Sequence, residues 1–394
     1  MDSRYRGAAW YDLEADGSIP MNCFTLVVGA KASATGCVLV AQNEDDAGNI
    51  VVRHGLVGAK DWPEGTVLPH EEGLAAVPQA EHTAGFFWRE LRTQERGLSN
   101  ADGFYNEHGV LLVSNSCAKS RCDVEDASLV RDGGVAYLMR RITAERAASA
   151  RDAVRIMMEL ADTWGYAPSG RSYTVADSRE AFMIQFARGR QYIGARIPDD
   201  MVAVMPNHYL FHGLHEWPEM FYSRDVVRFA IEQGWYVPTV PGNDSDFDFA
   251  RAYQAPESYM TPSNVPRGRH AIRMLTGCDW QDEGRGMPFA VKPSEPVDLG
   301  TLRHVLSTHF EGTQDDALRF GPDGGPHDTP LRRICTSTTQ EALLADLRED
   351  PKRTTLYLAL GRPCVLPFFR VHPFLGLPEA LQPMESPHKA LERH

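Results

Sequence analysis

Two short apolar runs, joined by a connection of small residues, constrain the fold of this chain more than any other feature. The first run is Cys-Phe-Thr-Leu-Val-Val at 23–28 and the second is Cys-Val-Leu-Val-Ala-Gln at 37–42, and the connection between them begins at Gly29 and ends at Gly36. Apolar runs of this length bounded by glycine are typical of β-strands that pair as a hairpin. The sequence therefore predicts two paired strands of one sheet, starting at residue 23.

The expected register of this hairpin brings a thiol to a polar cluster. If Val28 pairs with Cys37, then Cys23 lies opposite Gln42, next to the Asn-Glu-Asp sequence at 43–45. A thiol beside carboxylate and amide groups is an arrangement that suits catalysis.

Strands and helices follow in blocks along the rest of the chain. Strands are predicted at 109–113, 173–176, 181–186 and 201–205, and helices at 135–147, from a cap at Ser149 onward, and from a cap at Ser223 to Gln233, closed by Gly234. Thr338 and Glu341 have the spacing of a capping box and predict one more helix over the segment 343–347. Strands, then helices, then strands again indicate an α+β fold in which helices lie outside stacked sheets.

Composition and charge exclude several classes of protein. With 394 residues, 43% apolar and 24% charged, the chain is expected to form one globular domain from residue 23 onward. A net charge of -13 opposes nucleic-acid binding, and no stretch reaches the roughly 20 apolar residues that span a bilayer. Residues 1–22 lack the apolar centre of a signal peptide, so we expect a cytoplasmic location; the sequence leaves homo-oligomerisation open.

The cysteines predict neither disulfides nor a metal site. There are seven of them, an odd number scattered through a long chain, which favours reduced thiols. Cys117 and Cys122 are five residues apart, with no matching Cys or His pair at zinc-finger spacing. We therefore expect no metal site at these cysteines.

A catalytic thiol at Cys23 needs a base, and the sequence ties no histidine to it. A cysteine at an N-terminus has another base, because its own α-amino group has a pKa of about 7.7 to 8.0. This route requires cleavage between Asn22 and Cys23, and makes 1–22 a leader and 23–394 the mature domain. Met21 is an alternative translation start, which would shorten the leader to two residues.

The motifs resemble those of a known family. Cys23-Phe24-Thr25, the following segments 28–33 and 41–45, and later pieces resemble the C69 dipeptidases, which are related to the secernins and to the choloylglycine and penicillin V amidohydrolases. The later pieces are 106–110, Asn115, 176–181, Asn207, 333–335 and 356–363. The resemblance implies the four-layer αββα sandwich of N-terminal nucleophile hydrolases.

The resemblance also implies roles for five residues. Cys23 would be the nucleophile, and Asp45 would hold its α-ammonium group. Asn115 and Asn207 would position the amine or donate hydrogen bonds to the oxyanion. Arg224 resembles an active-site arginine of the choloylglycine relatives.

One position departs from the family pattern. The relatives usually carry Arg or Lys before the Asn of the Asn-x-Asp motif, whereas this chain has Gln42. Gln42 can donate hydrogen bonds but supplies no charge, so we treat it as a candidate substrate-binding residue. Arg224 is a candidate source of the missing positive charge.

The function that the resemblance implies is cysteine amide hydrolysis. The substrate would be a dipeptide or a small N-acyl amide, attacked through a thioester acyl-enzyme without metal or cofactor. Two alternatives stay open: an acyltransferase that passes the same thioester to an amine, and a secernin-like protein that binds partners without turnover.

Overall fold

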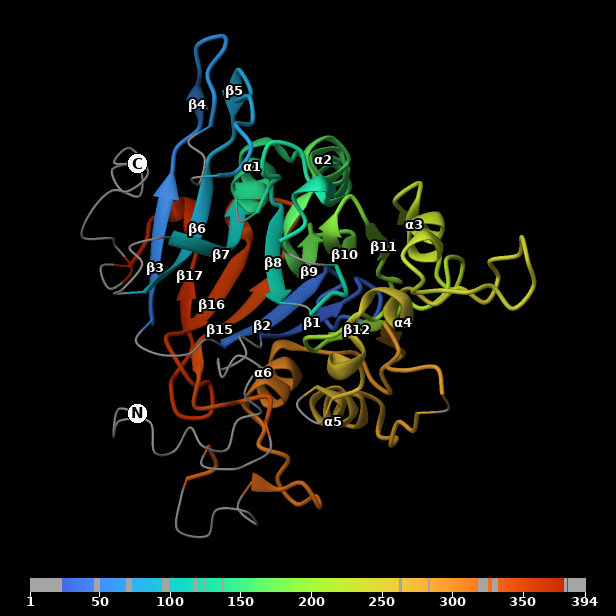
Figure 1. Ribbon diagram of the computed structural model, residues 1–394. Coiled ribbons are helices and arrows are strands. Elements are labelled where there is room, and N and C mark those ends of the chain that lie inside the picture. Colours follow the sequence, from blue (N-terminus) through green and yellow to red (C-terminus); the bar gives the residue numbers. More distant parts are fainter. Residues whose placement is uncertain are drawn as a thin grey trace, which may run out of the picture.

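Two large antiparallel sheets form the centre of the protein (Figure 1). The computed structural model describes residues 23–45, 50–68, 73–93, 99–116, 119–122, 125–136, 138–261, 264–282, 284–317, 325–327, 332–378 and 381. The expected leader 1–22, with Met21, and Cys117 lie outside the described residues.

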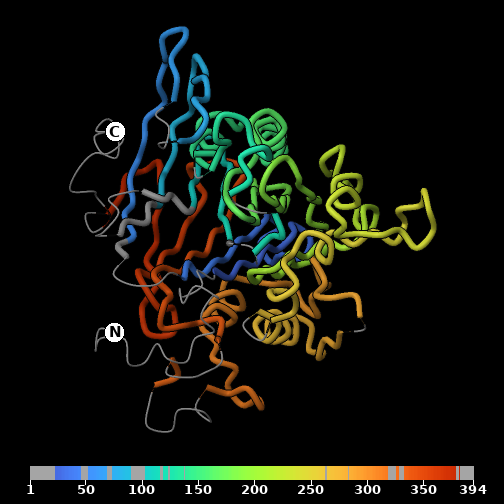
Figure 2. The backbone as a smooth tube through the Cα atoms, viewed as in Figure 1, coloured from blue at the N-terminus to red at the C-terminus, as the bar shows by residue number. Residues whose placement is uncertain are grey.

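The first sheet has seven strands and contains the predicted hairpin. In spatial order its strands are β14 (Ala290–Val291), β12 (Val202–Met205), β1 (Phe24–Val28), β2 (Leu39–Asp45), β15 (Thr339–Asp346), β16 (Thr355–Ala359) and β17 (Phe369–Val371). The hairpin β1–β2 lies at the centre, and β15, from the last part of the chain, pairs with β2, so the first and the last strands of the sequence lie in one sheet (Figure 2).

The second sheet has eight strands and packs face to face on the first. In spatial order its strands are β13 (Met220–Tyr222), β11 (Tyr192–Arg196), β10 (Ala181–Gly189), β9 (Tyr166–Ala176), β8 (Leu111–Ser116), β7 (Ser99–Asn106), β6 (Phe86–Thr93) and β3 (Ile50–Val57). A small separate ladder joins β4 (Lys60–Asp61) to β5 (His82–Thr83).

Helices cover both outer faces of this pair of sheets. On the eight-stranded sheet, α1 (Leu138–Arg146) packs on β7 and α2 (Ala150–Trp164) packs on β9 and β10. On the seven-stranded sheet, α5 (Val265–Thr276) packs on β12 and α6 (Leu299–Ser307) packs on β2 and β15. Two short helices, α3 (Val226–Glu232) and α4 (Phe249–Tyr253), lie beside the edge of the sheets (Figure 1). The predicted αββα sandwich is confirmed.

Alternation along the strands divides the core into three apolar layers. In β1, Val27 faces the layer between the sheets, whereas Leu26 faces the layer under α5 and α6. In β8, Val113 faces the layer between the sheets and Leu112 faces the layer under α1 and α2. Every strand at the centre is therefore buried on both sides, as its continuous apolar sequence requires.

The hairpin is confirmed, but its predicted register is wrong by two residues. Val28 pairs with Leu39 rather than Cys37. The connection is longer than the glycines indicated because its backbone hydrogen-bonds elsewhere: Lys31 donates to the carbonyl of Asp199 and Ala34 to that of Val297. These contacts keep Cys37 out of the strand.

The helix predictions had mixed outcomes at their ends. Ser149 caps α2 as predicted, because its hydroxyl accepts from the backbone amide of Asp152 at 3.1 Å. Ser223 does not cap α3; its hydroxyl donates to Gln191, and the helix begins at Val226 after Asp225.

The capping box at Thr338 and Glu341 is also wrong, because this segment is strand β15. Leu343 faces the layer between the sheets and Leu344 the layer under α6, which is strand alternation. The Glu341 carboxylate pairs with groups of the opposite sheet and not with a helix terminus. No helix in the described ranges is long and apolar enough to cross a bilayer.

Candidate active site around Cys23

Cys23 immediately precedes β1 and is 2% exposed. The observed register puts Phe24 opposite Asn43, so Cys23 faces the position of Glu44. The thiol donates a hydrogen bond to Oε1 of Glu44 at 3.2 Å, and this carboxylate is itself buried. A buried thiol therefore has a carboxylate as its direct neighbour.

Asn115 joins the two sheets beside this thiol. It is almost fully buried on β8, and its Oδ1 accepts from the hydroxyl of Thr25 at 2.7 Å. Its Nδ2 donates to the carbonyl of Met205 at 3.0 Å, on the other neighbour of β1. Asn115, one of the predicted site residues, is thus held two residues along the strand from Cys23.

Gln42 is fully buried and is bound at both ends of its amide. Its Nε2 donates to the carbonyl of Ser114 at 2.8 Å, and its Oε1 accepts from Nη1 of Arg89 at 3.0 Å. Arg89 also pairs with Glu341, which is bound by His54 as well. These contacts tie Gln42 into a polar link between the sheets.

Asp45 lies on the other face of the seven-stranded sheet, with Asn43. Its Oδ1 accepts from the hydroxyl of Thr339 at 2.6 Å, and Nη2 of Arg332 lies 3.8 Å from its Oδ2. Full burial raises the pKa of Asp45, while Arg332, Thr339 and Arg267 act in the opposite direction. By strand alternation, Asp45 therefore points to the opposite face of β2 from Glu44, the neighbour of the Cys23 thiol.

Asn207 is brought to Cys23 by an arginine of α5. Oδ1 of Asn207 accepts from Nη2 of Arg267 at 2.8 Å, and Nη1 of the same guanidinium lies 3.4 Å from the Cys23 carbonyl oxygen. Asn264 braces both groups, because it accepts from Arg267 at 2.5 Å and donates to the Asn207 carbonyl at 2.7 Å. Asn207 and Cys23 thus share one positively charged partner.

Arg267 is the cation of this site. It is fully buried, and burial, followed by repulsion from Arg332, lowers its pKa to about 9, while Asp45 and Cys23 raise it. A guanidinium with this pKa is charged at neutral pH. A buried cation near the thiol favours the thiolate form of cysteine.

Arg224 is not among the residues gathered around Cys23. It is exposed, between β13 and α3. Sequence reasoning selected Arg224 on a short match and missed Arg267, although a signal was present. Arg267, Ala271 and Leu275 fall on one face of α5 at a spacing of four, so Arg267 lies on the apolar stripe of its helix.

Glu44 was also missed. Side chains alternate along a strand, so the residue of the Asn-Glu-Asp sequence that shares a face with Gln42 is Glu44 and not Asp45. Alternation alone would therefore have selected the carboxylate on the Cys23 side of the strand.

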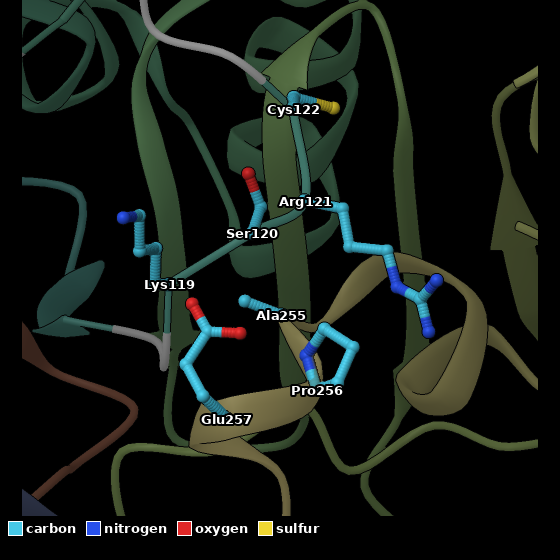
Figure 3. Close-up of a pocket in the computed structure, with 7 residues that line it drawn as sticks. All are labelled: Lys119, Ser120, Arg121, Cys122, Ala255, Pro256 and Glu257. Carbon is cyan, nitrogen blue, oxygen red and sulfur yellow. The ribbon is translucent and has the colours of Figure 1, made fainter.

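The structure also contains a pocket (Figure 3). It has a volume of about 370 Å³ and lies between the segment that follows β8 and the turn that follows α4. In Figure 3, Glu257 extends from that turn toward Ser120. Its lining residues are Lys119, Ser120, Arg121, Cys122, Ala255, Pro256 and Glu257, and none of them contacts Cys23 through a described hydrogen bond.

Comparison with known proteins gives a consistent family. The family model described as "Peptidase family C69" matches residues 22–376. A probable dipeptidase of Latilactobacillus sakei is 23% identical, over 88% of this chain and 72% of its own length. A probable dipeptidase of Salmonella dublin is 24% identical, over 88% and 81%.

Two solved structures are also similar. A penicillin V acylase from Agrobacterium tumefaciens has a TM-score of 0.41 at 12% identity and covers 90% of this chain and 86% of its own. A mutant conjugated bile acid hydrolase from Clostridium perfringens has a TM-score of 0.37 at 9% identity and covers 91% and 94%.

Proposed function

The chain belongs to peptidase family C69, and from this premise we propose that it is a cysteine amidohydrolase that cleaves dipeptides with Cys23 as nucleophile. The observation that carries the proposal is the buried Cys23 thiol, which has a carboxylate acceptor in Glu44, while the Arg267 guanidinium lies against the carbonyl oxygen of the same residue and interacts electrostatically with it. These two groups provide what a thiol needs to react: an acceptor for its proton and a positive charge near the resulting thiolate.

In this proposal the first reaction is maturation. Before cleavage, the nitrogen of Cys23 is an amide and cannot act as a base, so Glu44 takes the proton of the thiol. The thiolate attacks the carbonyl carbon of Asn22, the Asn22 to Cys23 amide bond breaks, and the nitrogen leaves with a proton as an amine. Water then hydrolyses the thioester, which releases residues 1–22 as a carboxylate and restores the thiol.

Turnover of a dipeptide follows the same course with a different base. The new α-amino group of Cys23 accepts the thiol proton and then gives it to the leaving amine of the substrate. The thioester acyl-enzyme is released by water. Oδ2 of Asp45 and Oε2 of Glu44 are buried without a hydrogen-bond partner among the described residues, so each can accept from an α-ammonium group.

Asn207 is the proposed oxyanion donor. The guanidinium of Arg267 donates to the amide oxygen of Asn207, and this fixes the orientation of the amide and therefore the direction in which its nitrogen points. An amide nitrogen oriented in advance can stabilise the negative oxygen of a tetrahedral intermediate without reorganisation. Asn115 acts indirectly in this scheme, by holding Thr25 and thereby the start of β1.

The proposal is tested by incubating the purified protein with a panel of dipeptides and measuring released amino acids. We expect hydrolysis by the wild type, no hydrolysis by Cys23→Ala, and unchanged hydrolysis by the control Cys278→Ala, whose thiol is exposed. Transfer of the acyl group to an added amine, faster than to water, would identify an acyltransferase instead. Stable binding of dipeptides without any product would favour a non-catalytic relative.

A further inference from the structure

A second cluster of nucleophilic and metal-ligating side chains lies outside the site of Cys23. It consists of His309, His327, Cys335 and Cys364, each of which offers one ligand atom, and these atoms all lie within 4.8 Å of one another. His309 follows α6, Cys335 precedes β15, and Cys364 follows β16. Segments that are distant in the sequence therefore bring two imidazoles and two thiols to one point.

Three distances within this group match the edges of a tetrahedral metal site. Nε2 of His309 and Nε2 of His327 are 3.0 Å apart, and the sulfurs of Cys335 and Cys364 each lie 3.5 Å from Nε2 of His327. Zinc bonds of about 2.0 to 2.1 Å to nitrogen and about 2.3 Å to sulfur give tetrahedral edges of about 3.3 Å for N···N and about 3.6 Å for N···S. These three separations differ from the tetrahedral edges by at most a few tenths of an ångström, and the other pairs of ligand atoms lie within 4.8 Å.

Hydrogen bonding alone explains this convergence poorly. Nε2 of His327 carries at most one proton, yet it is within 3.5 Å of three ligand atoms. One ring nitrogen has a single position in the plane of its ring, a proton or a lone pair, and so makes one well-directed hydrogen bond, whether it donates or accepts. A metal ion placed between the four atoms binds all of them. Cys335 and His309 are buried, so water has little access to their ligand atoms.

The surroundings of His309 are those of a metal ligand. Its Nδ1 is 2.9 Å from Oε1 of Glu311, an arrangement that orients the ring and leaves Nε2 as the coordinating atom. Glu311 is fixed in turn, since its other oxygen accepts from the hydroxyl of Thr308 and the backbone amide of His309. The intervening Phe310 has a φ of 67°, a left-handed conformation that is uncommon for a residue with a side chain and turns the chain back at this point.

We propose that His309, His327, Cys335 and Cys364 bind a structural zinc ion. The ligand set Cys₂His₂ is one that zinc favours, and four protein ligands leave no open position for a substrate. Arg362 lies 3.2 Å from Nδ1 of His327, and because its side chain is exposed it can move away when Nε2 binds the metal and the proton moves to Nδ1. The sequence predicted no metal because it considered only cysteines close together in the chain, whereas these four ligands come from separate segments.

The zinc ion would hold the segment that supports the active site. The carbonyl of Ile334, next to Cys335, accepts from Nδ2 of Asn43, and Thr339 a few residues later donates to Asp45. The backbone amide of Cys335 donates to Thr308 at the end of α6. Loss of the metal is therefore expected to weaken the contacts that Ile334 and Thr339 make with Asn43 and Asp45 of β2.

The test is a measurement of bound metal on the full chain, expressed with zinc in the medium and purified without chelators. Mass spectrometry of metals is expected to give about one zinc per chain for wild type and for the control Cys278→Ser, and at least a tenfold lower content for Cys335→Ser and Cys364→Ser. Replacement of zinc by cobalt is expected to give the visible bands of a tetrahedral thiolate site in the wild type and in Cys278→Ser, but not in Cys335→Ser or Cys364→Ser.

Two results would overturn the proposal. One is wild-type protein with no zinc and no cobalt spectrum after incubation with either metal. The other is a disulfide between Cys335 and Cys364, seen as a loss of two hydrogens in the intact mass of protein prepared under reducing cytosolic conditions. The wild-type measurements decide the question even if a variant fails to fold, and they do not depend on peptidase activity.

Discussion

Glu341 is expected to be the most important single charge between the two sheets. It is fully buried on β15, and its carboxylate is bound by Nε of Arg89 on β6 and by Nε2 of His54 on β3. Arg89 is also buried and passes the connection on to Gln42. The substitution Glu341→Gln keeps the size of this side chain but leaves the Arg89 guanidinium without its counter-charge.

The expected cost follows from this burial. Removing one partner of a buried ion pair typically lowers the free energy of unfolding by about 3–5 kcal/mol, because the remaining charge stays desolvated. Burial acts to raise the pKa of Glu341, but Arg89 and then His54 outweigh it, and the resulting pKa is below the ordinary value. A carboxylate with a lowered pKa stabilises the fold above its ordinary pKa, and this contribution is lost as the pH falls through the folded-state pKa. The difference in free energy of unfolding between wild type and variant should therefore have its largest value at pH 7 and decrease below about pH 4.

Urea unfolding followed by tryptophan fluorescence measures this difference. Glu349→Gln is the matched control, since Glu349 is 82% exposed and pairs with the exposed Arg179, so its removal should cost about 0–1 kcal/mol. The double variant Arg89→Met with Glu341→Leu should lose less stability than Glu341→Gln, because no charge is left unpaired. A Glu341→Gln loss no larger than that of Glu349→Gln, or one that does not shrink as the pH is lowered well below 4, would refute the reasoning.

Three further predictions concern the site itself. Asn207→Ala should lower kcat by about 10²- to 10³-fold with a smaller change in KM, as measured by steady-state dipeptide hydrolysis; an unchanged kcat would exclude Asn207 as the oxyanion donor. Thr25→Val leaves the buried Oδ1 of Asn115 without its donor and should reduce the free energy of unfolding by about 1–3 kcal/mol, whereas Thr25→Ser should retain most of it. Glu44→Gln should slow the appearance of cleaved protein in a time course of intact mass, and equal rates in both proteins would exclude Glu44 as the base for maturation.

Local patterns predicted the parts of the fold that depend on neighbours in the chain. The hairpin, the Ser149 cap and the order of strands and helices follow from turn residues, capping groups and apolar periodicity, which act over a few residues. The predicted register was wrong because a contact with a distant part of the chain shapes the connection: the backbone amide of Lys31 donates to the carbonyl of Asp199. Thr338 and Glu341 misled in the same way, since the partner of Glu341 is on the opposite sheet.

The candidate site was predicted in part for the same reason. Cys23, Asn115 and Asn207 are brought together through Thr25 and Arg267, and these are contacts between elements that no spacing in the sequence specifies. The expected cation at Arg224 is exposed, and the one that contacts Cys23 is Arg267, more than 240 residues away in the chain. Strand alternation, applied to β2, would have identified Glu44.

The central claim is that Cys23 becomes an N-terminal nucleophile, and the most direct measurement is the intact mass and N-terminal sequence of the natively expressed protein together with its Cys23→Ala variant. We predict a wild-type chain that begins at Cys23, whether translation starts at Met1 or at Met21, and a variant that keeps the preceding residues. A wild-type protein that hydrolyses dipeptides while Asn22 is still joined to Cys23 would contradict the mechanism.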